Sequence, residues 1–269
     1  MESSCNLKSV GTDPNLVPAE MSAPPPAAPT RDPVWSGWDV FFTALLAFGA
    51  SLVLAVLVGL VLGLRPKPGE FQPEMVRAAI TAQMVAYALV AVYVYSLVVY
   101  HYRQPFLTAI RWNWPPTPVL WVLAGIGMSL AVMVISRFLP VPRDLPVERY
   151  FTDRRLAFLL VFFGTAVAPL VEEVFFRGFL YPVLRSRMGI PVATAFTAGI
   201  FAVIHGQQVD LAWAPLMMLF GVGLTLTVVR ERTGSVSTTF LMHLGYNATL
   251  FLLLALATKG FTEAPKVAP

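Results

Sequence analysis

Seven long apolar runs constrain the fold of this chain more than any other feature of its sequence. As an α-helix, about 20 apolar residues cross roughly 30 Å of hydrocarbon, the thickness of a membrane core. In chain order the runs cover residues 38–64, 78–100, 119–139, 156–184, 190–205, 211–229 and 236–257. The sequence therefore predicts an all-α fold, a polytopic transmembrane bundle of about seven or eight helices.

Composition and charge agree with a membrane protein. Hydrophobic residues make up 57% of the chain and charged residues only 13%, against about 25% charged residues in soluble domains. The basic residues stand between the apolar runs, where they can anchor loops to lipid headgroups, so the net charge of +4 does not predict a nucleic-acid partner. We expect a multi-pass integral protein of the cell (inner) membrane, with the lipid bilayer as its surroundings.

The ends of the apolar region suggest one domain with a tail. Residues 1–34 contain a proline run at 24–26 and few large apolar groups, so we expect a disordered tail. Residues 35–269 are expected to form a single transmembrane domain. The run 190–205 is short enough to be partly re-entrant, and the loop 140–155 could hold a short amphipathic helix. The single cysteine, Cys5, allows neither an intramolecular disulfide nor a cysteine metal site.

Ionisable residues inside the fourth run are the first sign of function. Glu172 and Glu173 are adjacent, so helix geometry places their side chains about 100° apart. Glu173 and Arg177 are four residues apart and can pair on one face. Glu172 then remains free to act as a general base. The alternative is that all three residues form only a structural ion-pair network near the membrane surface.

Two histidines and an asparagine lie in later runs. His205 ends the fifth run, where a lone histidine is often an interfacial or core residue. His243 and Asn247 are four residues apart on one helix face, where two donors can stabilise an oxyanion or serve as hydrogen bonds between helices. Taken together with Glu172 and Glu173, these groups lie within about 75 residues and predict an intramembrane polar cavity suited to water activation, with or without a metal.

These residues resemble the CAAX-protease and bacteriocin-processing intramembrane proteases, also called the Abi or Rce1-like family. The family pattern is Glu-Glu-x-x-x-Arg, Phe-x-x-x-His and His-x-x-x-Asn on successive membrane helices. In this chain the pattern is filled, in order, by Glu172-Glu173 to Arg177, Phe201 to His205, and His243 to Asn247. The resemblance covers about residues 155–257, which would be the catalytic core.

The resemblance implies an endopeptidase with assigned roles for these residues. Glu172 would activate water with help from His205, while His243 and Asn247 would bind the oxyanion. Glu173 would join them in the catalytic set, with Arg177 and Phe201 in support. Members are often described as metalloproteases, so zinc held by Glu172, His205 and His243 is a candidate cofactor. The chain lacks the His-Glu-x-x-His helix of zincins.

The resemblance also implies a peptide or protein substrate, one that could be lipid-modified or membrane-anchored. Two other functions stay open on the sequence alone. The polar cavity could hold a partner in a non-proteolytic scaffold, for example in immunity or secretion. Buried Glu and His side chains also serve as proton relays in transporters, although no inverted repeat is visible in the sequence.

Overall fold

The computed structural model describes residues 32–65, 72–142, 151 and 153–262. The described residues contain helices and loops but no strand, which confirms the predicted all-α class. Most of the expected tail, residues 1–34, and most of the loop 140–155 lie outside the described residues. The described residues form one compact unit.

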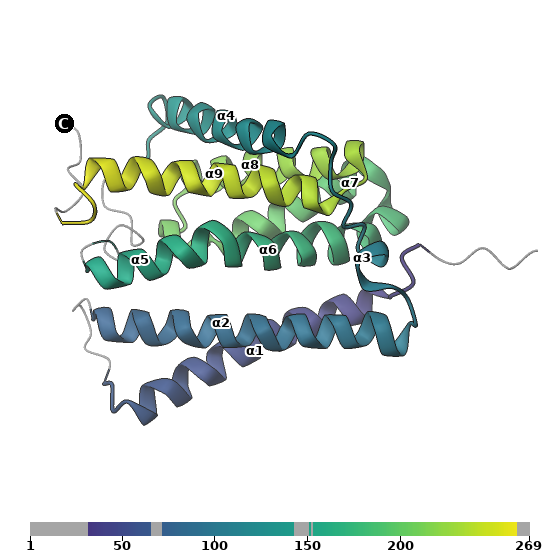
Figure 1. Ribbon diagram of the computed structural model, residues 1–269, viewed down its shortest axis with the longest axis horizontal. Coiled ribbons are helices and arrows are strands. Elements are labelled where there is room, and N and C mark those ends of the chain that lie inside the picture. The colour runs from purple at the N-terminus through teal and green to yellow at the C-terminus, as the bar shows by residue number, and fades with distance from the viewer. Residues whose placement is uncertain (1–31, 66–71, 143–150, 152, 263–269) are drawn as a thin grey trace, which may run out of the picture. The chain divides into compact units, whose positions relative to one another are not determined.

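The helices and helical turns follow one another along the chain in the order shown in Figure 1. They are α1 (Gly37–Val61), α2 (Pro73–Ser96), the π-helical turn η1 (Leu97–His101), α3 (Phe106–Ala109), α4 (Pro118–Ser136), α5 (Arg154–Phe162), the π-helical η3 (Phe163–Val167), α6 (Ala168–Glu173), the π-helical η4 (Val174–Leu180), α7 (Tyr181–Ile204), the 3-10 turn η5 (Gly206–Val209), α8 (Trp213–Thr233) and α9 (Val236–Ala257).

Six helical segments of the described residues are long and apolar enough to cross a membrane. Seven were predicted, and the difference arises because the runs 156–184 and 190–205 fall in one helical segment, Arg154–Ile204. Gly189 interrupts that segment with φ 75° and ψ 170°, a backbone conformation open to glycine but strained for other residues. The polytopic bundle is confirmed, with its fourth and fifth predicted runs joined at a break.

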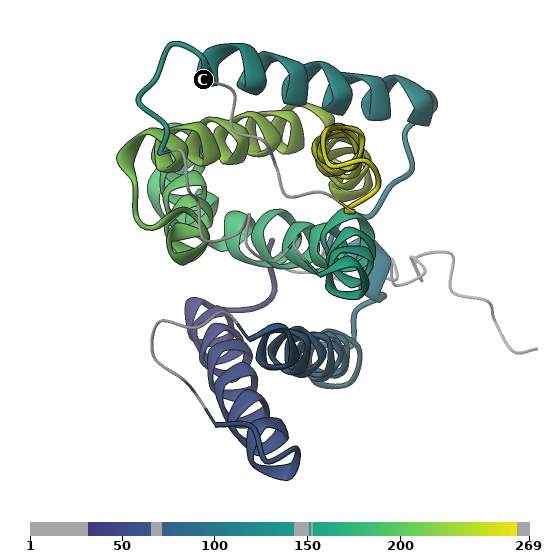
Figure 2. The ribbon, with the colours of Figure 1, turned by 90° about the vertical axis from the view of Figure 1, so that its left-hand side faces the viewer.

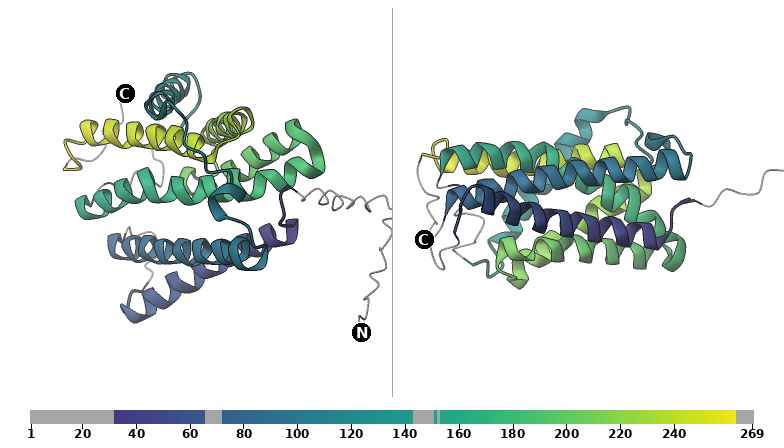
Figure 3. Two further views of the ribbon diagram at one scale, coloured as in Figure 1. Left: turned by 45° about the vertical axis from the view of Figure 1, so that its right-hand side comes forward. Right: turned by 90° about the horizontal axis from the view of Figure 1, so that it is seen from below.

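Helix pairing gives the unit an outer and an inner part. α1 packs on α2, α7 on α8, and α4 on α9. Seen end-on, α1 and α2 lie on one side and α4 on the opposite side, with α5 to α9 between them (Figure 2). The further views show α1 on the outside of α2 (Figure 3). The helix that carries the two glutamates, α6, therefore lies in the interior of the bundle.

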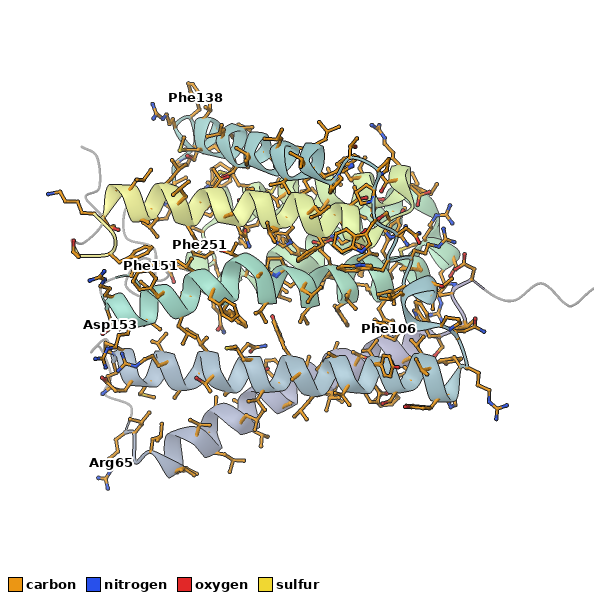
Figure 4. The ribbon with its side chains drawn as sticks, in the orientation of Figure 1. Arg65, Phe106, Phe138, Phe151, Asp153 and Phe251 are labelled. Atoms are coloured by element: carbon orange, nitrogen blue, oxygen red, sulfur yellow. The ribbon has the colours of Figure 1, made fainter. Side chains whose placement is uncertain are left out.

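Large apolar side chains cover the outer surface of α1 and α4, as expected for helices that face lipid. Charged groups gather at the ends of the helices instead (Figure 4). Arg65 and Asp153 both lie at the end opposite Phe106 in that view. There Arg77 at the start of α2 pairs with Asp153 at 3.1 Å, and Asp153 caps α5 by accepting a hydrogen bond from the amide of Leu156.

The α4–α9 contact depends on two glycines. A methyl group on Gly125 would lie 2.0 Å from the carbonyl oxygen of Met242, and one on Gly245 would lie 2.3 Å from that of Val122. Backbone therefore packs directly on backbone, as is common where small residues line membrane-helix contacts. α9 carries His243 and Asn247, so this contact also holds one wall of the polar cluster.

Gly125→Ala should destabilise the protein, because the new methyl group cannot fit without separating α4 from α9. An overpacked contact of this kind costs about 1–3 kcal/mol. Gly127→Ala is the matched control, since Gly127 lies two residues along α4 with nothing within 4 Å of the added atom. The thermal unfolding midpoints of the two purified variants, measured in one detergent, test this. Equal midpoints would show that the α4–α9 contact does not depend on Gly125.

Candidate active site

A buried ion pair lies at the centre of the bundle. Arg177 Nη1 donates to Glu173 Oε1 at 2.8 Å, and both side chains are 0% exposed. Arg177 Nη2 also donates to the carbonyl of Gly223 on α8 at 3.0 Å. The predicted pairing of residues four apart is therefore present, and it joins η4 to α8 as well.

Glu173 has a second partner that sequence reasoning missed. His243 Nδ1 lies 2.8 Å from the same carboxylate oxygen, Glu173 Oε1. A carboxylate only accepts, so Nδ1 of His243 carries a proton and donates it. This hydrogen bond ties α9 to α6 across the bundle and fixes the orientation of the imidazole. Its other nitrogen, Nε2, is left for a different partner.

Glu172 lies between the two imidazoles. Its Oε1 is 3.9 Å from His205 Nε2, and its Oε2 is 3.9 Å from His243 Nε2. These distances exceed a direct hydrogen bond and are short enough for one water molecule to bond both groups. The Glu172 side chain is 11% exposed, so it is largely buried but water can still reach its carboxylate. Helix geometry predicted that Glu172 points away from Glu173, and the structure agrees.

His205 is fixed in the same manner as His243. Its Nδ1 lies 2.7 Å from the carbonyl oxygen of Phe201, one turn earlier on α7. A carbonyl accepts, so this nitrogen is also protonated and Nε2 is turned toward Glu172. Phe201 is buried, and its ring centroid lies 4.7 Å from the His205 ring, 5.8 Å from the His243 ring and 4.9 Å from Arg177 Cζ. Phe201 thus packs against the groups it was expected to support.

Asn247 has a partner of a different kind. Its Nδ2 donates to the carbonyl of Gly164 in η3 at 2.7 Å. In this π-helical turn the amide of Ala168 bonds to Phe163, so the next amide in the series, at position 169, would bond to Gly164. Position 169 is proline, which has no N–H. The side chain of Asn247 therefore satisfies a carbonyl that Pro169 leaves without its backbone partner.

The same bond limits what was expected of Asn247. No described contact joins Asn247 to Glu172, His205 or His243, although it shares a helix face with His243. One of its two amide N–H groups is already used on Gly164. Only the second is available to a substrate.

The expected zinc set does not have metal spacing. Among the described residues no group of three His, Cys, Asp or Glu side chains could hold a metal ion. Bonds of 2.0–2.2 Å in a tetrahedral zinc site bring ligand atoms to about 3.4 Å from one another. The imidazole nitrogens of His205 and His243 each lie 3.9 Å from Glu172, so these residues as arranged do not fit the ion.

Tyr87 on α2 is a further neighbour of Glu172. It interacts electrostatically with Glu172, and Gln83 lies four residues earlier on the same helix. Its ring stacks on Phe163 at 5.7 Å between centroids. The sequence holds one signal for it, a Gln and a Tyr one turn apart in an otherwise apolar run. That signal does not reveal which helix α2 faces.

The polar cluster lies within the part of the chain that matches a known family. Residues 154–249 match the family model described as type II CAAX prenyl endopeptidase Rce1-like. This stretch contains both glutamates, both histidines and Asn247. Residues 154–249 are similar to the Rce1-like family. At this coarse level the match indicates an intramembrane protease, and the six apolar helices indicate an integral membrane protein.

One similar protein has a name that states no activity. An uncharacterized 24.3 kDa protein of Escherichia coli is 29% identical over 153 residues, which cover 52% of this chain and 69% of that protein. No solved structure matches the chain.

Glu173→Gln should destabilise the fold far more than Glu172→Gln. The first change leaves the buried Arg177 without its counter-charge, which costs about 3–5 kcal/mol. The second removes a carboxylate that makes no direct hydrogen bond to either histidine. The thermal unfolding midpoints of the two variants in detergent test this. An equal decrease in midpoint for both variants would contradict the supporting role of Glu173.

Asn247→Ala should cost about 1–2 kcal/mol, because it leaves the Gly164 carbonyl unsatisfied inside the membrane. In a Pro169→Ala background the same change should cost less, since the restored backbone N–H can bond to Gly164. Unfolding midpoints of the four proteins in this cycle measure the coupling. An equal cost of Asn247→Ala in both backgrounds would overturn this reading of Asn247.

Proposed function

We propose that this protein is a membrane-embedded endopeptidase that hydrolyses a peptide bond with a water molecule activated by Glu172. One observation carries the proposal. The Glu172 carboxylate lies between two imidazole Nε2 atoms, each 3.9 Å away, in a region where these side chains are at most 15% exposed. A carboxylate and an imidazole that face one small space can orient a water and take its proton.

The fixed orientation of His243 supports a role at the oxyanion. Glu173 holds the imidazole through Nδ1 at 2.8 Å, so that Nε2 is turned toward Glu172. The mechanism assigns Nε2 of His243 the role of hydrogen-bond donor toward the reacting carbonyl.

The reaction follows from these donors and acceptors. A water held between Glu172 and His205 Nε2 gives a proton to Glu172 as its oxygen attacks the carbonyl carbon. The resulting oxyanion accepts a hydrogen bond from His243 Nε2–H, with the second N–H of Asn247 as a further donor. When the C–N bond breaks, Glu172 returns the proton to the leaving amine. The hydroxyl stays on the new carboxyl group, so atoms and protons balance.

An apolar cavity beside the cluster supports a membrane-embedded substrate. Its volume is about 480 Å³, and α2, α3 and the helix that carries Glu172 form its walls. Val171 and Val174 line it on either side of the two glutamates. An extended apolar or lipid-modified peptide segment would be shielded from water there. We therefore propose a peptide or protein substrate that is membrane-anchored, as the CAAX endopeptidase description of the family suggests.

Neither of the other functions considered from the sequence has a specific observation in its favour. A scaffold would not need a free carboxylate between two oriented imidazoles. A proton pathway would need a chain of polar groups that continues across the membrane.

Glu172→Gln should abolish cleavage, with a rate at least about 1000-fold below the parent, because the base is lost while the fold is kept. Substrates are found by comparing membrane peptides of cells that carry the parent or the variant. The peptide that accumulates uncleaved is then assayed with purified protein in vesicles. Glu74→Gln is the control, since Glu74 is an exposed carboxylate at the start of α2.

Two outcomes would contradict a metal-free reaction with Glu172 as the base. Cleavage by Glu172→Gln at the parent rate would exclude Glu172 as the base. Loss of cleavage after thorough chelation, with recovery on adding zinc, would show that a zinc ion takes part in the reaction. We expect the rate to survive chelation.

A further inference from the structure

A small polar cavity lies away from the glutamates, between the end of α8 and the start of α9. Its volume is about 70 Å³, room for several water molecules or one small polyatomic ion. Its polar lining residues are Asp32, Arg111, Tyr181, Arg185, Arg230 and Glu231. Three arginines and two carboxylates give this lining one excess positive charge.

The ion pairs in the lining locate the excess charge. Arg185 pairs with Glu231 at 2.9 Å, and Arg111 pairs with Asp32. Tyr181 donates its hydroxyl to Glu231 at 2.9 Å. Both carboxylates are therefore engaged by other groups, which leaves Arg230 as the cation without a direct ion pair among the described residues.

Arg230 is buried, with only 4% of its surface exposed. Its Nε donates to the carbonyl of Arg177 at 3.1 Å. No described residue accepts a hydrogen bond from its two terminal amino groups, Nη1 and Nη2. A buried guanidinium without a counter-charge is costly, so an anion in the adjoining cavity would remove that cost. A guanidinium also matches two oxygens of a phosphate at once.

The depth of the cavity identifies the source of the anion. Trp38 at the start of α1 is 68% exposed, and Trp114 shortly before α4 is 64% exposed. Exposed tryptophans mark the level of lipid headgroups. The start of α1 and the helix α3 lie at one end of the bundle (Figure 1). Arg111 lies two residues after α3, so the cavity lies at that headgroup level.

We propose that this cavity binds the phosphate group of an anionic membrane phospholipid, with Arg230 as its principal ligand. The three arginines disfavour the additional cation of a zwitterionic headgroup, so a net-negative lipid is preferred. The site is independent of the proposed protease function. Its occupation would also hold η4, because Arg230 bonds to the backbone of Arg177.

Native mass spectrometry of the purified full chain, with added phosphatidylglycerol or phosphatidylcholine, tests the proposal. We expect phosphatidylglycerol to bind more tightly, and Arg230→Gln to weaken it about 10- to 100-fold, the usual effect of losing charge-assisted hydrogen bonds. Arg232→Gln is the matched control, since Arg232 is exposed two residues along α8. It should bind like the parent.

Glu231→Gln provides a change in the opposite direction. It removes a negative charge from the lining, so it should tighten phosphatidylglycerol binding even if Arg230→Gln folds poorly. Equal binding of the two lipids, or no effect of both Arg230→Gln and Glu231→Gln, would overturn the proposal. Displacement of the lipid by millimolar inorganic phosphate in the parent would overturn its assignment to a lipid.

Discussion

The buried contact of Glu173 with Arg177 and His243 is the interaction on which the rest of the site depends. One carboxylate oxygen accepts hydrogen bonds from both side chains at 2.8 Å. Arg177 continues to the backbone of Gly223, so α6, η4, α8 and α9 meet at a single ion pair. Charges inside a membrane are costly unless paired. If these helices separated, the charges would lose their partners at a high cost in free energy. The bundle therefore has one preferred arrangement around the glutamates.

The different roles of the two glutamates follow from this contact. Glu173 is fully enclosed and engaged, so its role is to orient His243. Glu172 points the other way on the helix and faces two imidazole nitrogens without bonding directly to either. The π-helical turns on both sides of α6 set the local direction of the chain, and they are frequent at functional sites. Pro169 and Asn247 show how one such turn is accommodated in this protein.

Local geometry made part of the site predictable from the sequence. The pairing of Glu173 with Arg177 and the shared face of His243 and Asn247 both follow from a spacing of four residues. The contact of Glu173 with His243 did not follow, because it depends on how α6 crosses α9. Tyr87 was missed for the same reason, and the partner of Asn247 depends on a π-helical turn that apolar periodicity does not reveal. The runs predicted the spans well, except that the fourth and fifth share one helical segment broken at Gly189.

In the proposed reaction, Glu172 and His205 act on one water molecule. A double-mutant cycle of cleavage rates tests it most directly, with Glu172→Gln, His205→Gln and the double variant compared per folded molecule on one substrate. Residues that act as a unit lose activity non-additively. If both side chains act on one water molecule, the double variant should be no slower than Glu172→Gln alone. If the rate losses of the two single variants instead multiply in the double variant, the two side chains act in separate steps and the shared water is wrong.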